Sequence, residues 1–273
     1  MTSPIEPRKA SLYHASRGSV VEPALAGAIV MTAIATYLLV PTLLPPGLAM
    51  VAAQAMLVAI PVGGVVLGRL GRPLALLGLR RAPGRFFVAA FAIGATAWFV
   101  SFWVVTLLPL PEREAKALEA LVERPSLAGA IALFAVVPAV CEEILFRGVL
   151  ARALGRHLPL AGAAATSALV FAVYHLSIVQ ALPTLTLGFL LAVIAIRADS
   201  VLPTIVAHAL NNTMAITMSR GALPAIAGWM AGHPALALAG CATTSALGLA
   251  LAARRRSTSA EVVGEISPPQ ITG

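Results

Sequence analysis

The chain has 273 residues, of which 59% are hydrophobic and only 11% are charged, with a mean hydropathy of +0.91. Soluble domains carry about 25% charged residues, so this composition excludes a soluble protein and predicts a polytopic membrane protein. The net charge of +8 does not indicate nucleic acid, because the basic residues are scattered between apolar segments and form no basic face with interleaved aromatic residues. The expected partner of the surface is therefore the lipid bilayer.

The apolar segments predict an all-α bundle of about eight transmembrane helices, at about 23–44, 48–70, 86–110, 126–154, 159–176, 181–196, 201–218 and 234–253. In chain order we expect a tail (1–22), three transmembrane helices (23–110) and an amphipathic surface helix (111–125). Four transmembrane helices (126–218), a last transmembrane helix (219–253) and a second tail (254–273) follow. The surface helix is expected because Leu118, Leu121 and Val122 share one face of its segment, while Glu and Arg residues occupy the other.

Eight spans place both termini on the same side of the membrane, and the basic residues predict which side this is. Of the 19 Lys and Arg residues, 14 fall on the side of the termini, four on the opposite side, and one, Arg147, within a span. The positive-inside rule then predicts cytoplasmic N and C termini. The many Arg, Ala, Gly and Leu residues are typical of a GC-rich genome, so we expect the bacterial cytoplasmic (inner) membrane.

The fourth predicted span contains the sequence Cys-Glu-Glu-Ile-Leu-Phe-Arg-Gly, residues 141–148. Three charged side chains in one span oppose insertion by about 8 to 10 kcal/mol before any pairing, so a function is expected. Glu143 and Arg147 are four residues apart and share a helix face, in the order that favours an ion pair. Glu142 lies about 100° around the helix, which leaves it free for chemistry.

Two later spans carry further polar residues, His175 in the fifth and His208, Asn211 and Asn212 in the seventh. A lone His in an apolar helix is more often a structural hydrogen bonder than a ligand or a base. Here two such residues accompany a buried carboxylate pair, and His208 and Asn212 are four apart, so they face the same way. The helix rise gives Glu142, His208 and Asn212 similar depths, whereas His175 comes out deeper, and we expect all four to meet in one water-filled cavity.

The three motifs together resemble those of a known protease family. The pattern Glu142-Glu143-x-x-x-Arg147, then Phe171-x-x-x-His175, then His208-x-x-x-Asn212 is similar to the signature of the CPBP family, the CAAX-prenyl-protease-like and bacteriocin-processing intramembrane proteases, also called the Abi family. The resemblance covers about residues 126–218. Each motif alone is weak, but three in order on three spans are specific.

The resemblance implies an endopeptidase that cuts at or within the membrane. Carried over residue by residue, it implies that Glu142 and His175 activate the attacking water and that His208 and Asn212 stabilise the oxyanion. Glu143 and Arg147, together with Phe171, would support the site. The implied substrate is a membrane-associated protein or peptide, for example one with a C-terminal sorting signal, as in the myxosortases, or a CAAX-like end.

The cofactor is open at this point. Glu142, His175 and His208 form a possible zinc set, since two His and one Glu leave a position for water. A metal-free glutamate mechanism uses the same residues, and the absence of a His-Glu-x-x-His helix favours that mechanism slightly.

Two other functions use the same residues. Intramembrane ionisable groups also mark ion paths, as in a transporter or channel, although the chain shows no matching broken helices in two repeated halves. A non-catalytic scaffold or immunity protein of the same family is the other alternative, and the intact set of polar residues argues against it.

Overall fold

The computed structural model describes residues 20–109 and 111–254, and within these ranges the chain forms helices and no strand. The predicted tails, 1–22 and 254–273, lie outside the described residues apart from residues 20–22 and Arg254. The helices in chain order are α2 (Pro23–Leu43), α3 (Pro46–Leu67), α4 (Pro73–Leu76), α5 (Gly84–Thr106), α6 (Glu112–Glu123), α7 (Leu127–Ile131), η2 (Ala132–Val136), α8 (Val137–Glu142), η3 (Glu143–Ala151), α9 (Arg152–Leu154), α10 (Leu160–Tyr174), α11 (Ile178–Ala198), α12 (Leu202–Ser219), α13 (Pro224–Gly232) and α14 (Pro234–Ala253).

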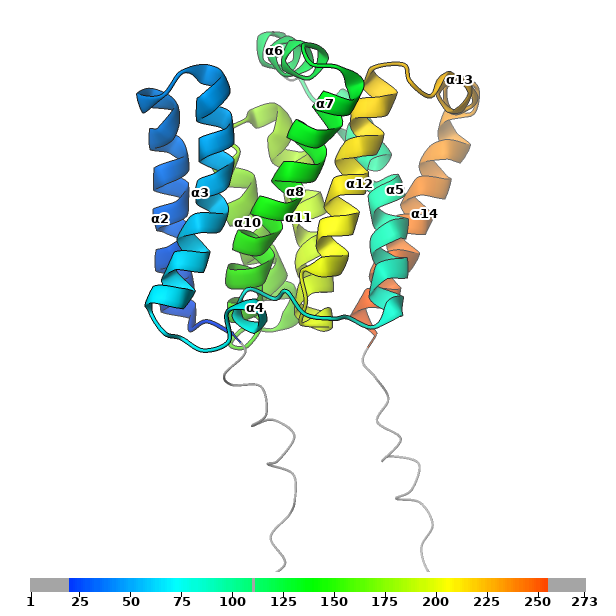
Figure 1. The fold of residues 1–273 in the computed structure, drawn as a ribbon. Coiled ribbons are helices and arrows are strands. Elements are labelled where there is room, and N and C mark those ends of the chain that lie inside the picture. Colours follow the sequence, from blue (N-terminus) through cyan, green and yellow to red (C-terminus); the bar gives the residue numbers. More distant parts are fainter. Residues whose placement is uncertain (1–19, 110, 255–273) are drawn as a thin grey trace, which may run out of the picture.

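The long helices stand next to one another as a single bundle (Figure 1). Within the described residues, six helices are long and apolar enough to cross a membrane: α2, α3, α5, the continuous helix Leu127–Leu154, α11 and α14. The chain is therefore an all-α polytopic membrane protein, as its composition predicts.

The other two predicted spans are present as helices of the bundle but are less typical of membrane spans. α10 is apolar but has only 15 residues and ends at Tyr174, two residues before the predicted end of the fifth span. α12 has 18 residues, and its His and Asn side chains lower its hydropathy. Both helices pack on the helices that carry the polar motif, α10 on η3 and α12 on α8 and η2. The polar groups of α12 can therefore find partners inside the bundle, where lipid would offer none.

The two ends of the bundle differ in what they carry. In Figure 1, α4 lies at the end where α2 begins and α14 finishes, while α6 and α13 lie across the opposite end.

Topology can be tested by cysteine-accessibility labelling at two exposed positions. Glu119 lies on α6 and Arg81 lies in the loop between α4 and α5. We expect a membrane-impermeant thiol reagent to label Glu119→Cys from outside the cell and Arg81→Cys only after the membrane is opened. Labelling of both positions from the same side would contradict the arrangement of the bundle ends.

The helix Leu127–Leu154 is the centre of the bundle. All nine residues of its η3 segment are buried, and α2, α3, α10 and α11 all pack against this segment. Gly148 is required by this packing, because a Cβ there would lie 2.3 Å from the carbonyl oxygen of Leu77. Both η2 and η3 are π-helical, a conformation that often marks functional sites; η3 begins directly after Glu142, and η2 ends six residues before it.

A second close approach places α12 beside α5. A Cβ at Gly94 of α5 would lie 2.6 Å from the carbonyl oxygen of Ala207, the residue before His208. The missing side chain lets the two backbones touch, as small residues do at helix interfaces in membranes. The position of His208 in the bundle therefore depends on a glycine of another helix.

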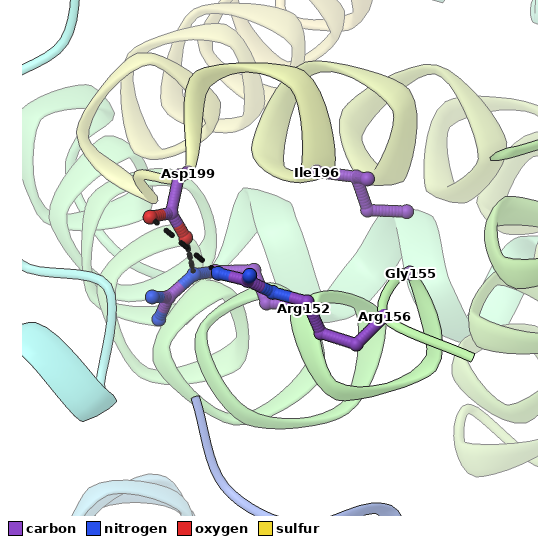
Figure 2. A pocket seen from close by; sticks show the side chains of 5 residues that line it. All are labelled: Arg152, Gly155, Arg156, Ile196 and Asp199. Carbon is purple, nitrogen blue, oxygen red and sulfur yellow. Dashed lines mark hydrogen bonds and ion pairs between the residues drawn. The ribbon is translucent and has the colours of Figure 1, made fainter. Parts of the chain in front are cut away.

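A charged cluster closes the α4 end of the bundle (Figure 2). Asp199 caps α11 in the left-handed conformation, with φ of 50°, and its carboxylate accepts hydrogen bonds from Arg152 Nε at 2.8 Å and Arg80 Nη1 at 2.6 Å. The buried Arg152 also donates to the carbonyl oxygens of Ala75, Leu76 and Gly148. These bonds join the loop after α4, the end of the central helix and the α11–α12 turn. A cavity of about 110 Å³ beside the cluster is lined by Arg152, Gly155, Arg156, Ile196 and Asp199.

The surface helix α6 has no buried residue and is tied to the opposite end of the bundle. Glu114 of α6 accepts a hydrogen bond from the hydroxyl of Ser177, which lies just after His175 in the α10–α11 loop. Beyond its other end, Pro125 O accepts a hydrogen bond of 2.8 Å from Arg220 at the end of α12. The segment that carries α6 is thus attached on both sides to helices that carry the motif residues.

Candidate functional site

Glu143 and Arg147 form the ion pair that their spacing predicts. The distance between Arg147 Nη1 and Glu143 Oε1 is 2.9 Å, and both side chains are fully buried. The guanidinium also lies over the ring of Phe171 from α10, 4.1 Å from its centroid. An aromatic face attracts a cation, so Phe171 stabilises the buried guanidinium from a second helix.

Glu143 also contacts His208 of α12. The distance between His208 Nδ1 and Glu143 Oε1 is 2.9 Å, so the ring donates its Nδ1–H to the carboxylate. This bond fixes the orientation of the imidazole and turns Nε2 toward Glu142, whose Oε2 is 4.0 Å away. One carboxylate thus holds both a guanidinium and an imidazole, as ion-pair and hydrogen-bond networks around catalytic His residues do.

Glu142 is buried, with 4% of its surface exposed, and has a different environment. Among the described residues, Glu142 Oε2 has no hydrogen-bond partner. The 4.0 Å gap to His208 Nε2 is too long for a direct hydrogen bond. A buried polar atom without a partner in the protein requires an explanation, and water or a substrate group supplies one.

His175 lies at the end of α10 and is oriented by its own helix. Its Nδ1–H donates to the carbonyl oxygen of Phe171 at 2.8 Å, so Nε2 is the ring nitrogen that this bond does not use. The rings of Phe171 and Tyr174 pack against it, with centroid distances of 4.7 and 5.1 Å. Phe171 therefore contacts His175 as well as Arg147, and its ring is 6.0 Å from that of His208.

Asn212 bonds to groups other than the remaining motif residues. Its Nδ2 donates to the carbonyl oxygen of Phe134 at 3.1 Å, and its Oδ1 accepts from Asn211 Nδ2 at 3.2 Å. The expected common face of His208 and Asn212 is present, since both lie on α12 one turn apart. The two side chains reach different parts of the central helix, however: His208 reaches η3 and Asn212 reaches η2.

The contacts of the described residues join most of the predicted site. Phe171 and Glu143 connect the other motif side chains, namely Arg147, His175, His208 and, across the 4.0 Å gap, Glu142. Asn212 is the predicted site residue outside this network.

The sequence left two possibilities for Glu142, His175 and His208: they bind zinc together, or they act without a metal. In the part of the chain that the structure describes, no three His, Cys, Asp or Glu side chains are grouped as a metal site requires. Of the expected ligands, Glu142 and His208 face each other across 4.0 Å. His175 is not grouped with them as a third ligand, so this arrangement does not form a three-ligand zinc site among the described residues.

Sequence reasoning did not find several residues that belong to this region. Tyr174, the residue before His175, is buried beside its ring. Tyr37 of α2 packs on it, with ring centroids 4.7 Å apart, and nothing in the sequence around Tyr37 signals this contact. Phe134 contributes through its main chain, which no side-chain motif can reveal. The sequence signal for this main-chain contribution is Pro138, four residues after Phe134, which cannot donate an N–H to the Phe134 carbonyl.

A comparison with protein families gives one match. Residues 124–214 match the family described as type II CAAX prenyl endopeptidase Rce1-like. The matched segment covers about a third of the chain and contains every motif residue from Glu142 to Asn212. No curated protein and no solved structure matches the chain.

Proposed function

We propose that this protein is an intramembrane endopeptidase that hydrolyses peptide bonds of membrane-associated protein substrates, because residues 124–214 match the model of a CAAX prenyl endopeptidase family. The observation that carries the proposal is Glu142, a buried carboxylate whose Oε2 lacks a partner among the described residues and faces His208 Nε2 across 4.0 Å. Glu143 uses its Oε1 for both Arg147 and His208 at 2.9 Å, whereas Glu142 has no comparably short contact to a charged side chain among the described residues. Glu142 is instead arranged to hold a water molecule.

In the proposed reaction, Glu142 and His175 activate the water. The carboxylate of Glu142 accepts a proton from the water, and the free Nε2 of His175 accepts a hydrogen bond from it. The water oxygen then attacks the carbonyl carbon of the substrate. When the carbon–nitrogen bond breaks, the proton passes from Glu142 to the leaving amine. Glu142 thus acts first as a general base and then as a general acid.

His208 and Asn212 are proposed to stabilise the oxyanion of the tetrahedral intermediate. His208 donates from Nδ1 to Glu143, so donation from Nε2 as well requires a ring that carries both protons. The second N–H of the Asn212 amide is the other donor. Loss of one oxyanion donor typically costs about 3 to 4 kcal/mol of transition-state stabilisation.

The family and the membrane fold indicate a protein or peptide substrate in a membrane. We propose that the substrate presents a C-terminal sorting signal or a CAAX-like end. We also propose that the protein resides in a bacterial cytoplasmic membrane with both termini in the cytoplasm, since the basic residues cluster on that side.

Proteolysis in a membrane fraction tests the proposed function. Membranes containing the protein are compared with membranes containing Glu142→Ala, and mass spectrometry identifies new peptide termini. We expect cleavage products only with the unchanged chain. Identical peptides in both samples would contradict the proposal and favour a scaffold. Proton flux into proteoliposomes without any cleavage would favour a transporter.

Removal of metal tests the proposed metal-free mechanism. We expect detergent-purified protein to keep full activity on a peptide identified in that assay after exhaustive chelation, with no metal found by elemental analysis. The reason is that Glu142, His175 and His208 are not grouped as three ligands of one metal among the described residues. Activity that disappears on chelation and returns with Zn²⁺ would contradict this mechanism and make Glu142, His175 and His208 the ligands to test.

A further inference from the structure

The central helix has one main-chain carbonyl that its own sequence prevents from forming the usual bond. In an α-helix the carbonyl of residue 134 accepts from the N–H of residue 138. Residue 138 is a proline, which has no N–H, and its ring also clashes with the carbonyl four residues before it. Phe134 lies in the π-helical segment η2, and Pro138 cannot offer an N–H to its carbonyl oxygen in the α-helical pattern.

Asn212 supplies a donor for this carbonyl. Asn212 Nδ2 lies 3.1 Å from Phe134 O, and Asn211 Nδ2 lies 3.2 Å from Asn212 Oδ1. The amide is thus held at both ends: its oxygen accepts from one neighbour and one of its two N–H groups donates to another. These two bonds fix the rotation of the amide plane and leave the direction of the second N–H defined.

We propose that Pro138 and Asn211 are positioning residues, which orient the amide of Asn212 so that its second N–H reaches the oxyanion. Pro138 acts through the carbonyl of Phe134, and Asn211 acts through its hydrogen bond to Asn212 Oδ1. This inference rests on the proposed oxyanion role of Asn212. It explains why a proline stands in the central helix one turn before Glu142, and why two asparagines are adjacent on α12. Neither residue needs to touch the substrate.

The sequence offers a direct measurement that requires no substrate. Asn211 and Asn212 are the two asparagines of the chain, so side-chain ¹⁵N-asparagine labelling produces two NH₂ groups in an NMR spectrum of the purified protein. The variant Asn211→Ala assigns them. We expect one Asn212 proton to be shifted downfield and protected from exchange, because it is bonded to Phe134 O, and the other to be free.

The decisive variant is Pro138→Ala, which restores the N–H that competes for Phe134 O. We expect the bonded Asn212 proton to lose its downfield shift and protection, with no loss of protein stability, because a proline inside a helix is unfavourable. The matched control is Pro61→Ala, which removes a helix-interior proline from α3 and should leave both NH₂ groups unchanged. Identical Asn212 signals in Pro138→Ala and in the unchanged chain would overturn the inference.

Kinetics separate this inference from the proposed function. We expect Asn212→Ala to lower kcat by about 10²- to 10³-fold with little change in KM. Pro138→Ala and Asn211→Ala should lower kcat by about 10- to 10²-fold, because a small misplacement of a donor is costly. In an Asn212→Ala background they should have no further effect. If Pro138→Ala or Asn211→Ala lowered kcat as much in the Asn212→Ala background as in the unchanged chain, the positioning role would be contradicted. An unchanged kcat in Asn212→Ala itself would contradict the oxyanion role of Asn212.

Discussion

Glu142→Gln is expected to abolish measurable turnover while the protein stays folded and abundant. Glutamine has nearly the same size and keeps a carbonyl oxygen toward His208, but it cannot accept the proton of the attacking water. General acid–base groups contribute about 10²- to 10⁴-fold to rates, so the loss should be of this size. The measurement is kcat on an identified peptide, together with protein abundance and thermal stability in the same detergent.

The control for this variant is Glu112→Gln on α6. Glu112 is an exposed carboxylate that pairs with Lys116 at 3.1 Å on the surface, and its loss should change neither activity nor stability. Wild-type activity in Glu142→Gln would mean that another group activates the water. A drop in abundance equal to the drop in activity would mean that Glu142 is structural.

Glu143→Gln is expected to destabilise the protein strongly and to lower activity as a consequence. It removes the negative charge that lies 2.9 Å from both Arg147 Nη1 and His208 Nδ1, in a place where neither Glu143 nor Arg147 is exposed. Breaking a buried ion pair by removing one partner typically costs about 3 to 5 kcal/mol, because it leaves an uncompensated buried charge. The free energy of unfolding in mixed micelles measures the effect.

A double variant separates charge from packing. Glu143→Gln with Arg147→Met removes both charges, so it should recover a large part of the lost stability. Activity should not recover, because His208 still lacks its carboxylate. If Glu143→Gln alone were as stable as the unchanged chain, the ion pair would not support the fold. If the double variant were less stable than Glu143→Gln, the contact of Arg147 with Phe171 would outweigh the charge effect.

The sequence was sufficient to predict the features that follow from local geometry and composition. High hydropathy with few charges predicts membrane helices, because each unpaired charge is costly in lipid. The spacing of Glu143 and Arg147 predicts their ion pair, because residues four apart on one helix are neighbours in any bundle. The order of the three motifs predicts the family that residues 124–214 match.

Only the tertiary structure decides which groups of different helices meet. The bond between His208 and Glu143 depends on how α12 packs against η3, and Gly94 of α5 sets how closely α5 approaches α12. The partner of Asn212 is a main-chain carbonyl that carries no side-chain signature, and the π-helical segments around Glu142 have no repeat that can be read from hydrophobic spacing. The helix repeat fixes distances within one helix, whereas packing of all helices against one another sets the distances between them.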